Sequence, residues 1–181
     1  MTGSLSIANG IAADERAQVA ELLGREPRGL EAIATRDRAG APVVIRVASL
    51  VDDEPFPTLY WLVGARESYL VDQLEAGGLI AQLQAQVDSD PTLQQTMGQD
   101  HQCHIERRYR LMSPRIRSGL VTKGYYDDLA SRGIGGIANF TRIRCLHTWF
   151  AAHCVEPNTI GHLLEYHCPS ISKGLMPIES A

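Results

Sequence analysis

The sequence has 181 residues, of which 44% are hydrophobic and 21% are charged, with a net charge of −4 at neutral pH. That length supports one hydrophobic core and is short for two, so we expect a single domain over residues 1–181. The acidic balance argues against nucleic acid as a partner, because such proteins present a basic surface with aromatic residues between the cations. No run approaches the ~18 apolar residues of a membrane span, and the first residues lack the pattern of a secretory signal, so we expect a cytoplasmic protein without membrane contact.

The N-terminal part of the chain predicts one helix followed by strands. Residues 12–23 carry apolar side chains at helical spacing, and Gly24 stands where a helix would end. Three runs with strand-like composition follow, and the short polar turns between them favour antiparallel neighbours. These runs are residues 30–35, 42–50 and 58–63.

Helical patterns follow the strands. Residues 66–87 repeat apolar side chains at helical spacing, with a weak point at Gly77-Gly78. Residues 91–112 predict a long helix that begins after Asp90, a natural N-cap.

The last third of the chain predicts shorter helices around a glycine loop. A short helix is expected over residues 122–131, and the glycine loop occupies residues 133–136. Asn139 or Thr141 is expected to cap the next helix, and a final helix covers residues 159–166.

These elements indicate an α+β fold, in which a small antiparallel three-stranded sheet packs against a mostly helical body. Residues 1–11 and 168–181 are expected to be loose termini. Five apolar residues are predicted to lie in the core: Tyr60, Leu62, Leu74, Leu146 and Phe150.

Positive charge is concentrated in one part of the chain. Between Arg107 and Arg144 lie nine basic and two acidic residues, a local charge of +7. Arginine makes up fifteen of the seventeen basic residues, and its planar fork suits carboxylate and phosphate groups. One hypothesis is a non-catalytic module that docks an acidic protein partner through the segment from Arg107 to Lys123; a GC-rich genome would also favour arginine without any such role.

The leading hypothesis is a site for a small anionic or phosphorylated ligand. A glycine turn can aim backbone N–H groups at an anion, and arginines can complete the clamp; the alternative is a plain loop with solvated arginines. The candidate ligand-binding residues are Arg28, Arg108, Gly135, Gly136, Arg142 and Arg144, with His147 beside them.

A second alternative is a metal site, because residues 101–168 hold all six histidines and all four cysteines. The candidate zinc or iron ligands are His101, His104, Cys145 and His147. On a helix, Cys145 and His147 would point about 200° apart and would not share an ion, whereas His101 and His104 can share a face. The alternative for the cysteines is the ordinary one of reduced, buried thiols.

Nucleophilic catalysis is a further hypothesis, with Cys145 as the nucleophile and His147 or His101 as its base. If Leu146 and Phe150 define the buried face of a helix, Arg144 and His147 border one cleft and Cys145 packs elsewhere. No reaction is singled out by these patterns.

Several motifs together resemble a bacterial family of uncharacterised proteins, domain of unknown function 501, from about residue 23 to residue 161. The motifs are residues 23–29, 55–62 and 74–78, His101 with Arg107 or Arg108, Gly135-Gly136, residues 144–147, and Asn158 with Gly161. The family has no established reaction, so the resemblance implies membership and no particular activity.

Overall fold

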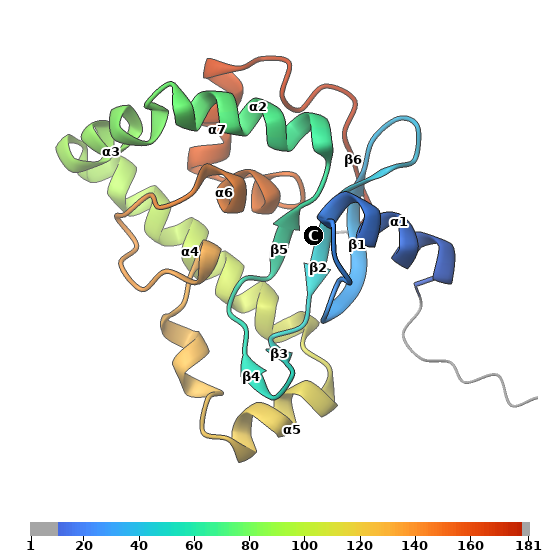
Figure 1. Ribbon diagram of the computed structural model, residues 1–181. Helices are drawn as coiled ribbons and strands as arrows, with labels where there is room; N and C mark the ends of the chain where they lie inside the picture. Colours follow the sequence, from blue (N-terminus) through green and yellow to red (C-terminus); the bar gives the residue numbers. More distant parts are fainter. Residues whose placement is uncertain (1–10, 179–181) are drawn as a thin grey trace, which may run out of the picture.

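A computed structural model describes residues 11–178 and shows the expected α+β fold, in which helices surround a small antiparallel sheet (Figure 1). Residues 1–10 and 179–181, parts of the termini that were predicted to be loose, lie outside the described range. None of the helices in the described range combines the length and the apolar character that crossing a membrane requires.

The main sheet has four antiparallel strands in the order β5-β2-β1-β6. They are β1 (Leu30–Arg36), β2 (Pro42–Val47), β5 (Tyr60–Leu62) and β6 (Met176–Pro177). The predicted meander is present as β1, β2 and β5, but the prediction of three strands is wrong by one. The fourth strand comes from the segment predicted to be a loose tail, where Met176 pairs with Arg36 and Ile171 is fully buried.

The second predicted strand is shorter than expected, because the chain leaves the sheet after Val47 and forms a separate hairpin. Strands β3 (Leu50–Val51) and β4 (Glu54–Pro55) pair antiparallel. Asp52 and Asp53 form their turn with φ of 50° and 67°, the left-handed region that a type I′ hairpin turn requires at both positions and that aspartate tolerates.

The helices match most of the predicted ones, but the helix predicted over residues 122–131 is only a 3₁₀ turn in its second half, and the helix expected after Asn139 or Thr141 begins only at Leu146. They are α1 (Ala13–Leu23), α2 (Ala65–Ala76), α3 (Leu79–Ser89), α4 (Pro91–Leu111), α5 (Pro114–Thr122), α6 (Leu146–His153) and α7 (Thr159–His167), with short 3₁₀ turns at η1 (Asp127–Ser131) and η2 (Ile134–Gly136). The predicted helix over residues 66–87 is divided at Gly78, whose φ is 83°. Asp90 caps α4 as predicted, accepting from two backbone N–H groups. Helix α5 was not predicted.

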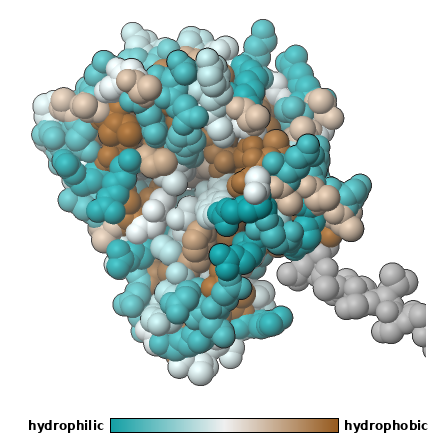
Figure 2. Space-filling model, viewed as in Figure 1, coloured by the Kyte–Doolittle hydropathy of each residue, from teal (hydrophilic) through white to brown (hydrophobic). Residues whose placement is uncertain are grey.

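Each face of the sheet packs against different helices. Alternate strand residues such as Ile33 and Ile45 join Val19 of α1 in one cluster, while Ala34 and Val44 join the larger cluster formed with the later helices. Helix α6 lies against β5 within that larger cluster. Hydrophilic side chains cover much of the face seen in Figure 2, with apolar residues between them.

The predicted core set is largely correct. Tyr60, Leu146 and Phe150 are buried, while Leu62 and Leu74 are partly buried and pack against the same cluster.

One arginine of the core joins several loop segments through hydrogen bonds. Arg108 of α4 is fully buried, and its guanidinium donates to four backbone carbonyl oxygens. These belong to Pro57 (2.7 Å), Leu129 (3.1 Å), Arg132 (2.6 Å) and Gly133 (3.2 Å). Burial lowers the pKa of Arg108 to about 10, so the side chain stays charged at neutral pH. The structure gives no support to the predicted place of Arg108 in a ligand site, because the side chain is fully buried and both of its terminal nitrogens donate to backbone carbonyls.

We predict that Arg108→Met lowers the free energy of unfolding by more than about 3 kcal/mol, because it leaves several buried carbonyl groups without donors. Urea unfolding followed by circular dichroism measures the effect. The matched control is Arg110→Met on the same helix, an exposed position where the change is expected to stay within about 0.5 kcal/mol. Equal stability of the two variants would contradict the structural role of Arg108.

Candidate functional site

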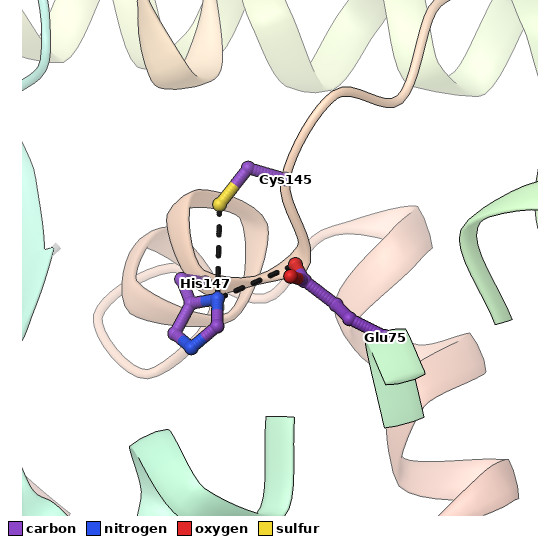
Figure 3. Close-up of side chains that lie close together, drawn as sticks. All are labelled: Glu75, Cys145 and His147. Atoms are coloured by element: carbon purple, nitrogen blue, oxygen red, sulfur yellow. Dashed lines mark hydrogen bonds and ion pairs between the residues drawn. The ribbon is translucent and has the colours of Figure 1, made fainter. Parts of the chain in front are cut away.

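Three metal-ligand side chains meet where the end of α2 faces the start of α6 (Figure 3). They are Glu75, Cys145 and His147, and their ligand atoms all lie within 4.8 Å of one another. Cys145 Sγ is 3.7 Å from His147 Nδ1, and Glu75 Oε1 is 3.3 Å from the same nitrogen. All three residues are partly exposed, so solvent reaches the cluster.

Cys145 and His147 face each other because the cysteine is not part of a helix. Cys145 has extended backbone angles (φ −154°, ψ 123°), and α6 begins only at Leu146. The prediction that these two side chains point about 200° apart assumed a helix through both residues and is wrong. The expectation that Cys145 packs away from His147 fails for the same reason.

The chain stays extended before α6 because a side-chain amide holds it. Gln84 of α3 accepts from the backbone N–H of Ile143 (2.9 Å) and donates to the carbonyl oxygen of Thr141 (2.9 Å). The predicted cap at Asn139 or Thr141 is wrong, since the Asn139 side chain bonds Thr141 locally and no helix follows directly.

Glu75 provides the N-terminal cap that α6 lacks. Cys145, at the N-cap, makes no side-chain cap bond, and the backbone N–H of Leu146 donates instead to Glu75 Oε1 at 2.6 Å. Glu75 lies in the last turn of α2, which ends at the Gly77-Gly78 reversal. The sequence hypotheses for this site missed Glu75; its only signal was its place in one of the family-like motifs, residues 74–78.

A second carboxylate contacts the other nitrogen of the His147 ring. Asp72 lies one turn before Glu75, and its Oδ1 is 3.2 Å from His147 Nε2. The contact with Cys145, together with Glu75, outweighs partial burial and raises the pKa of His147 to about 9. With no metal bound, His147 therefore carries a proton on each nitrogen and a positive charge at neutral pH.

The distances suit a metal ion. Bonds of about 2.3 Å to sulfur and about 2.05 Å to nitrogen or oxygen at tetrahedral angles place sulfur about 3.6 Å from nitrogen and nitrogen about 3.4 Å from oxygen. The observed separations are 3.7 Å and 3.3 Å. Asp72 on the far nitrogen is the carboxylate–histidine arrangement that leaves Nδ1 as the ligand atom.

The other predicted metal ligands do not join this group. His101 Nδ1 accepts from the backbone N–H of Ile134 (2.9 Å), and burial lowers the pKa of His101 to about 4. Its ring lies against Phe140 and Trp149. His104 is buried beside Tyr60, and burial also lowers its pKa. Both histidines are neutral core residues, and His101 is not placed to act as a base for Cys145.

A second His/Glu cluster is less suited to a metal. His153 Nε2 and His162 Nδ1 lie 3.3 Å and 3.4 Å from the Glu165 carboxylate. However, the backbone N–H of Asn158 donates to His153 Nδ1, so the proton of the neutral ring is on Nε2 and leaves no lone pair there. His153 therefore donates to Glu165.

The predicted anion-binding residues are not brought together in one cleft. Arg28 pairs with Asp52 (2.6 Å), and Arg142 lies 3.9 Å from Asp88. Arg144 is exposed and directly precedes Cys145, so it alone of the predicted arginines adjoins the cluster in sequence.

The glycine loop is shaped by packing. A Cβ on Gly135 would lie 2.7 Å from Thr148 Oγ1, and one on Gly136 would lie 2.7 Å from Pro57 Cγ; both glycines have positive φ. The N–H groups of Gly133, Ile134 and Gly136 donate within the protein and are not directed at a ligand.

The segment from Arg107 to Lys123 is less basic at the surface than its sequence implies. Arg107 is buried and donates to the Tyr60 hydroxyl (2.8 Å), and Arg108 is buried too. Lys123 lies 3.6 Å from Asp53. Docking of an acidic partner through this segment stays a prediction, with two fewer exposed cations.

We predict that Cys145→Ala and Glu75→Gln each lower the pKa of His147 in metal-free protein, with the larger drop for Cys145→Ala because that contact contributes most. Titration of the imidazole resonances by NMR measures both. His162→Gln, in the other cluster, is the control and should leave the pKa of His147 unchanged. A His147 that titrates near its ordinary pKa of 6.5 in the wild type would contradict this arrangement.

The same shift predicts how stability depends on pH. The pKa of His147 is raised in the folded chain, so its charge stabilises the fold fully below about pH 6.5 and that contribution is lost as the pH rises through about 9. We expect the difference in unfolding free energy between wild type and His147→Gln to shrink across this range in the presence of a chelator. A difference that stays constant from pH 6 to 10 would refute it.

Comparison with known proteins places the chain among relatives without an assigned activity. Neither a curated protein nor a solved structure matches it significantly. A family model described as a protein of unknown function, DUF501, matches residues 33–165, which is more than half of the chain. Two motifs within that range, residues 74–78 and 144–147, supply Glu75, Cys145 and His147. The chain belongs to the DUF501 family.

Proposed function

We propose that this protein binds a divalent transition-metal ion, zinc or iron(II), through Glu75, Cys145 and His147. The observation that carries the proposal is the convergence of three ligand atoms of different type within 4.8 Å. The residues come from two segments about 70 positions apart. Glu75 is held by the Leu146 N–H and His147 by Asp72. A mixed sulfur, nitrogen and oxygen set favours zinc or iron over magnesium or calcium.

The charges of the site support a divalent ion. Cys145 as thiolate and Glu75 as carboxylate carry two negative charges, and a neutral His147 adds none. In the metal-free protein the His147 proton faces both groups; a metal ion replaces that proton. Binding should therefore release protons and weaken as the pH falls.

Three protein ligands leave one tetrahedral position for water or for a ligand. A zinc ion held there would lower the pKa of a bound water or polarise a bound carbonyl or phosphoryl oxygen. We propose that a small anionic or phosphorylated ligand binds at this open position. Arg144, which is exposed, is the nearest cation in the sequence.

Thiol catalysis is the second candidate, supported by one specific contact pattern. Cys145 Sγ faces His147 Nδ1 at 3.7 Å, and Asp72 holds Nε2 at 3.2 Å, the order of nucleophile, base and orienting acid. Glu75 counts against it, because a carboxylate beside the sulfur opposes formation of a thiolate. Metal binding uses all four side chains.

We predict that chelator-treated protein takes up one equivalent of zinc, measured by competition with a chromophoric chelator. Cys145→Ala, His147→Gln and Glu75→Gln should each weaken binding at least about tenfold, because each removes one ligand. The matched controls are Cys168→Ala and His162→Gln, which replace the same residue types outside the site.

A wild-type protein that takes up no zinc or iron(II) would refute the metal proposal. Equal affinity of Cys145→Ala and Cys168→Ala would refute it as well. If metal is not bound and Cys145 reacts with iodoacetamide much faster than Cys168 does, the thiol candidate takes its place.

A further inference from the structure

A second candidate site is lined by residues of α1, the first two strands and α5 and shares no residue with the α2–α6 cluster. Figure 1 shows where these elements lie in the fold. It is a cleft of about 830 Å³, within the size range of small-molecule sites. Three arginines from three different elements line it: Arg16 of α1, Arg46 of β2 and Arg115 of α5. Neither the metal site nor the sequence hypotheses accounts for this convergence.

The acidic residues of the cleft are already balanced. Glu31 lies 3.4 Å from Arg46, and the two carboxylates of the β3–β4 turn pair with cations outside the lining. Those pairs are Asp52 with Arg28 (2.6 Å) and Asp53 with Lys123 (3.6 Å).

One positive charge is left over in the cleft. Arg16 lies 3.1 Å from Glu26, whereas Arg115 has no carboxylate within ion-pair distance anywhere in residues 11–178. The lining alone, with three arginines and three acidic residues, is neutral. Because Arg28 and Lys123 pair with two of those acidic residues from outside, Arg115 is left as the cation without an acidic partner among the described residues.

The walls combine apolar surface with a fixed frame. Leu30, Leu111 and Ile116 line the cleft beside the charged groups. A Cβ on Gly29 would lie 2.5 Å from Val51 Cγ2, and one on Gly119 would lie 2.7 Å from Leu50 Cδ2, so both glycines permit close packing of the walls. Arg115 is exposed and stays in contact with solvent, so the apolar residues contribute contact area for an organic ligand rather than a stronger field at the cation.

We propose that this cleft binds a small organic anion, with a carboxylate or phosphate group at Arg115 and an apolar part against the leucine and isoleucine walls. A guanidinium binds either oxyanion through paired N–H groups. This site is independent of the metal proposal, since the two share no residue.

The test is an NMR titration of ¹⁵N-labelled full-length protein with phenyl phosphate, benzoate and the uncharged benzyl alcohol. Both anions are expected to shift the backbone amides of residues 29–31 and 115–119, and benzyl alcohol is not. Arg115→Ala should weaken anion binding at least about fivefold, and Arg115→Lys less, because lysine keeps the charge but not the fork. Arg110→Ala is the matched control and should bind as the wild type does.

The ratio of the two anion affinities identifies which oxyanion the cleft prefers. The proposal is overturned if no cleft amide shifts up to about 10 mM anion. It is also overturned if Arg115→Ala binds as tightly as Arg110→Ala, or if benzyl alcohol binds as well as the anions.

Discussion

The Arg108 guanidinium is the contact on which most of the irregular structure depends. The segment around Pro57, the 3₁₀ turn η1 and the glycine loop have few ladder partners, yet their buried carbonyl groups need donors. One planar group on a long helix satisfies four of them. Burying a charge in the core has an unfavourable desolvation free energy, and here carbonyl dipoles rather than a carboxylate offset it. The glycine loop that Arg108 anchors then packs against Thr148 of α6, so a contact in the core helps to position the helix that carries His147.

Glu75 also links stability and chemistry at the start of α6. Its carboxylate replaces the missing cap of that helix and also faces His147. A residue with both roles cannot move away without uncapping the helix, which keeps the three side chains of the proposed metal site together. Such preorganisation reduces the entropy that a binding site loses when it closes on its ligand. Asp72 adds to it by fixing the ring of His147 from behind.

Local signals in the sequence predicted much of the fold. Asp90 as a cap, Gly24 and Gly78 as helix breaks, and the turns between the first strands each depend on nearby residues, and each is present. Strand β6 was missed because two residues carry no periodicity, and its pairing with β1 spans most of the chain. The site was predicted in part: Cys145 and His147 were named but judged to point apart, and Glu75 was not considered. A contact such as that of Gln84 with residues 141–143, which decides where α6 begins, has no local trace in the sequence.

The beginning of α6 therefore has a consequence for how such centres are recognised. Inside a helix, residues two apart diverge, and a Cys-X-His sequence would be dismissed as a chelating pair. With the cysteine one residue outside the helix, the two side chains of the same Cys-X-His sequence face each other. A shift of the helix start by a single residue would rotate the sulfur by about 100° and turn it away from His147. Gln84 is not one of the three proposed ligands, yet by holding residues 141–143 it fixes where α6 begins and so how Cys145 and His147 face each other. The identity and spacing of residues therefore do not suffice to recognise a chelating motif. The position of each residue relative to the start of the helix must be known as well.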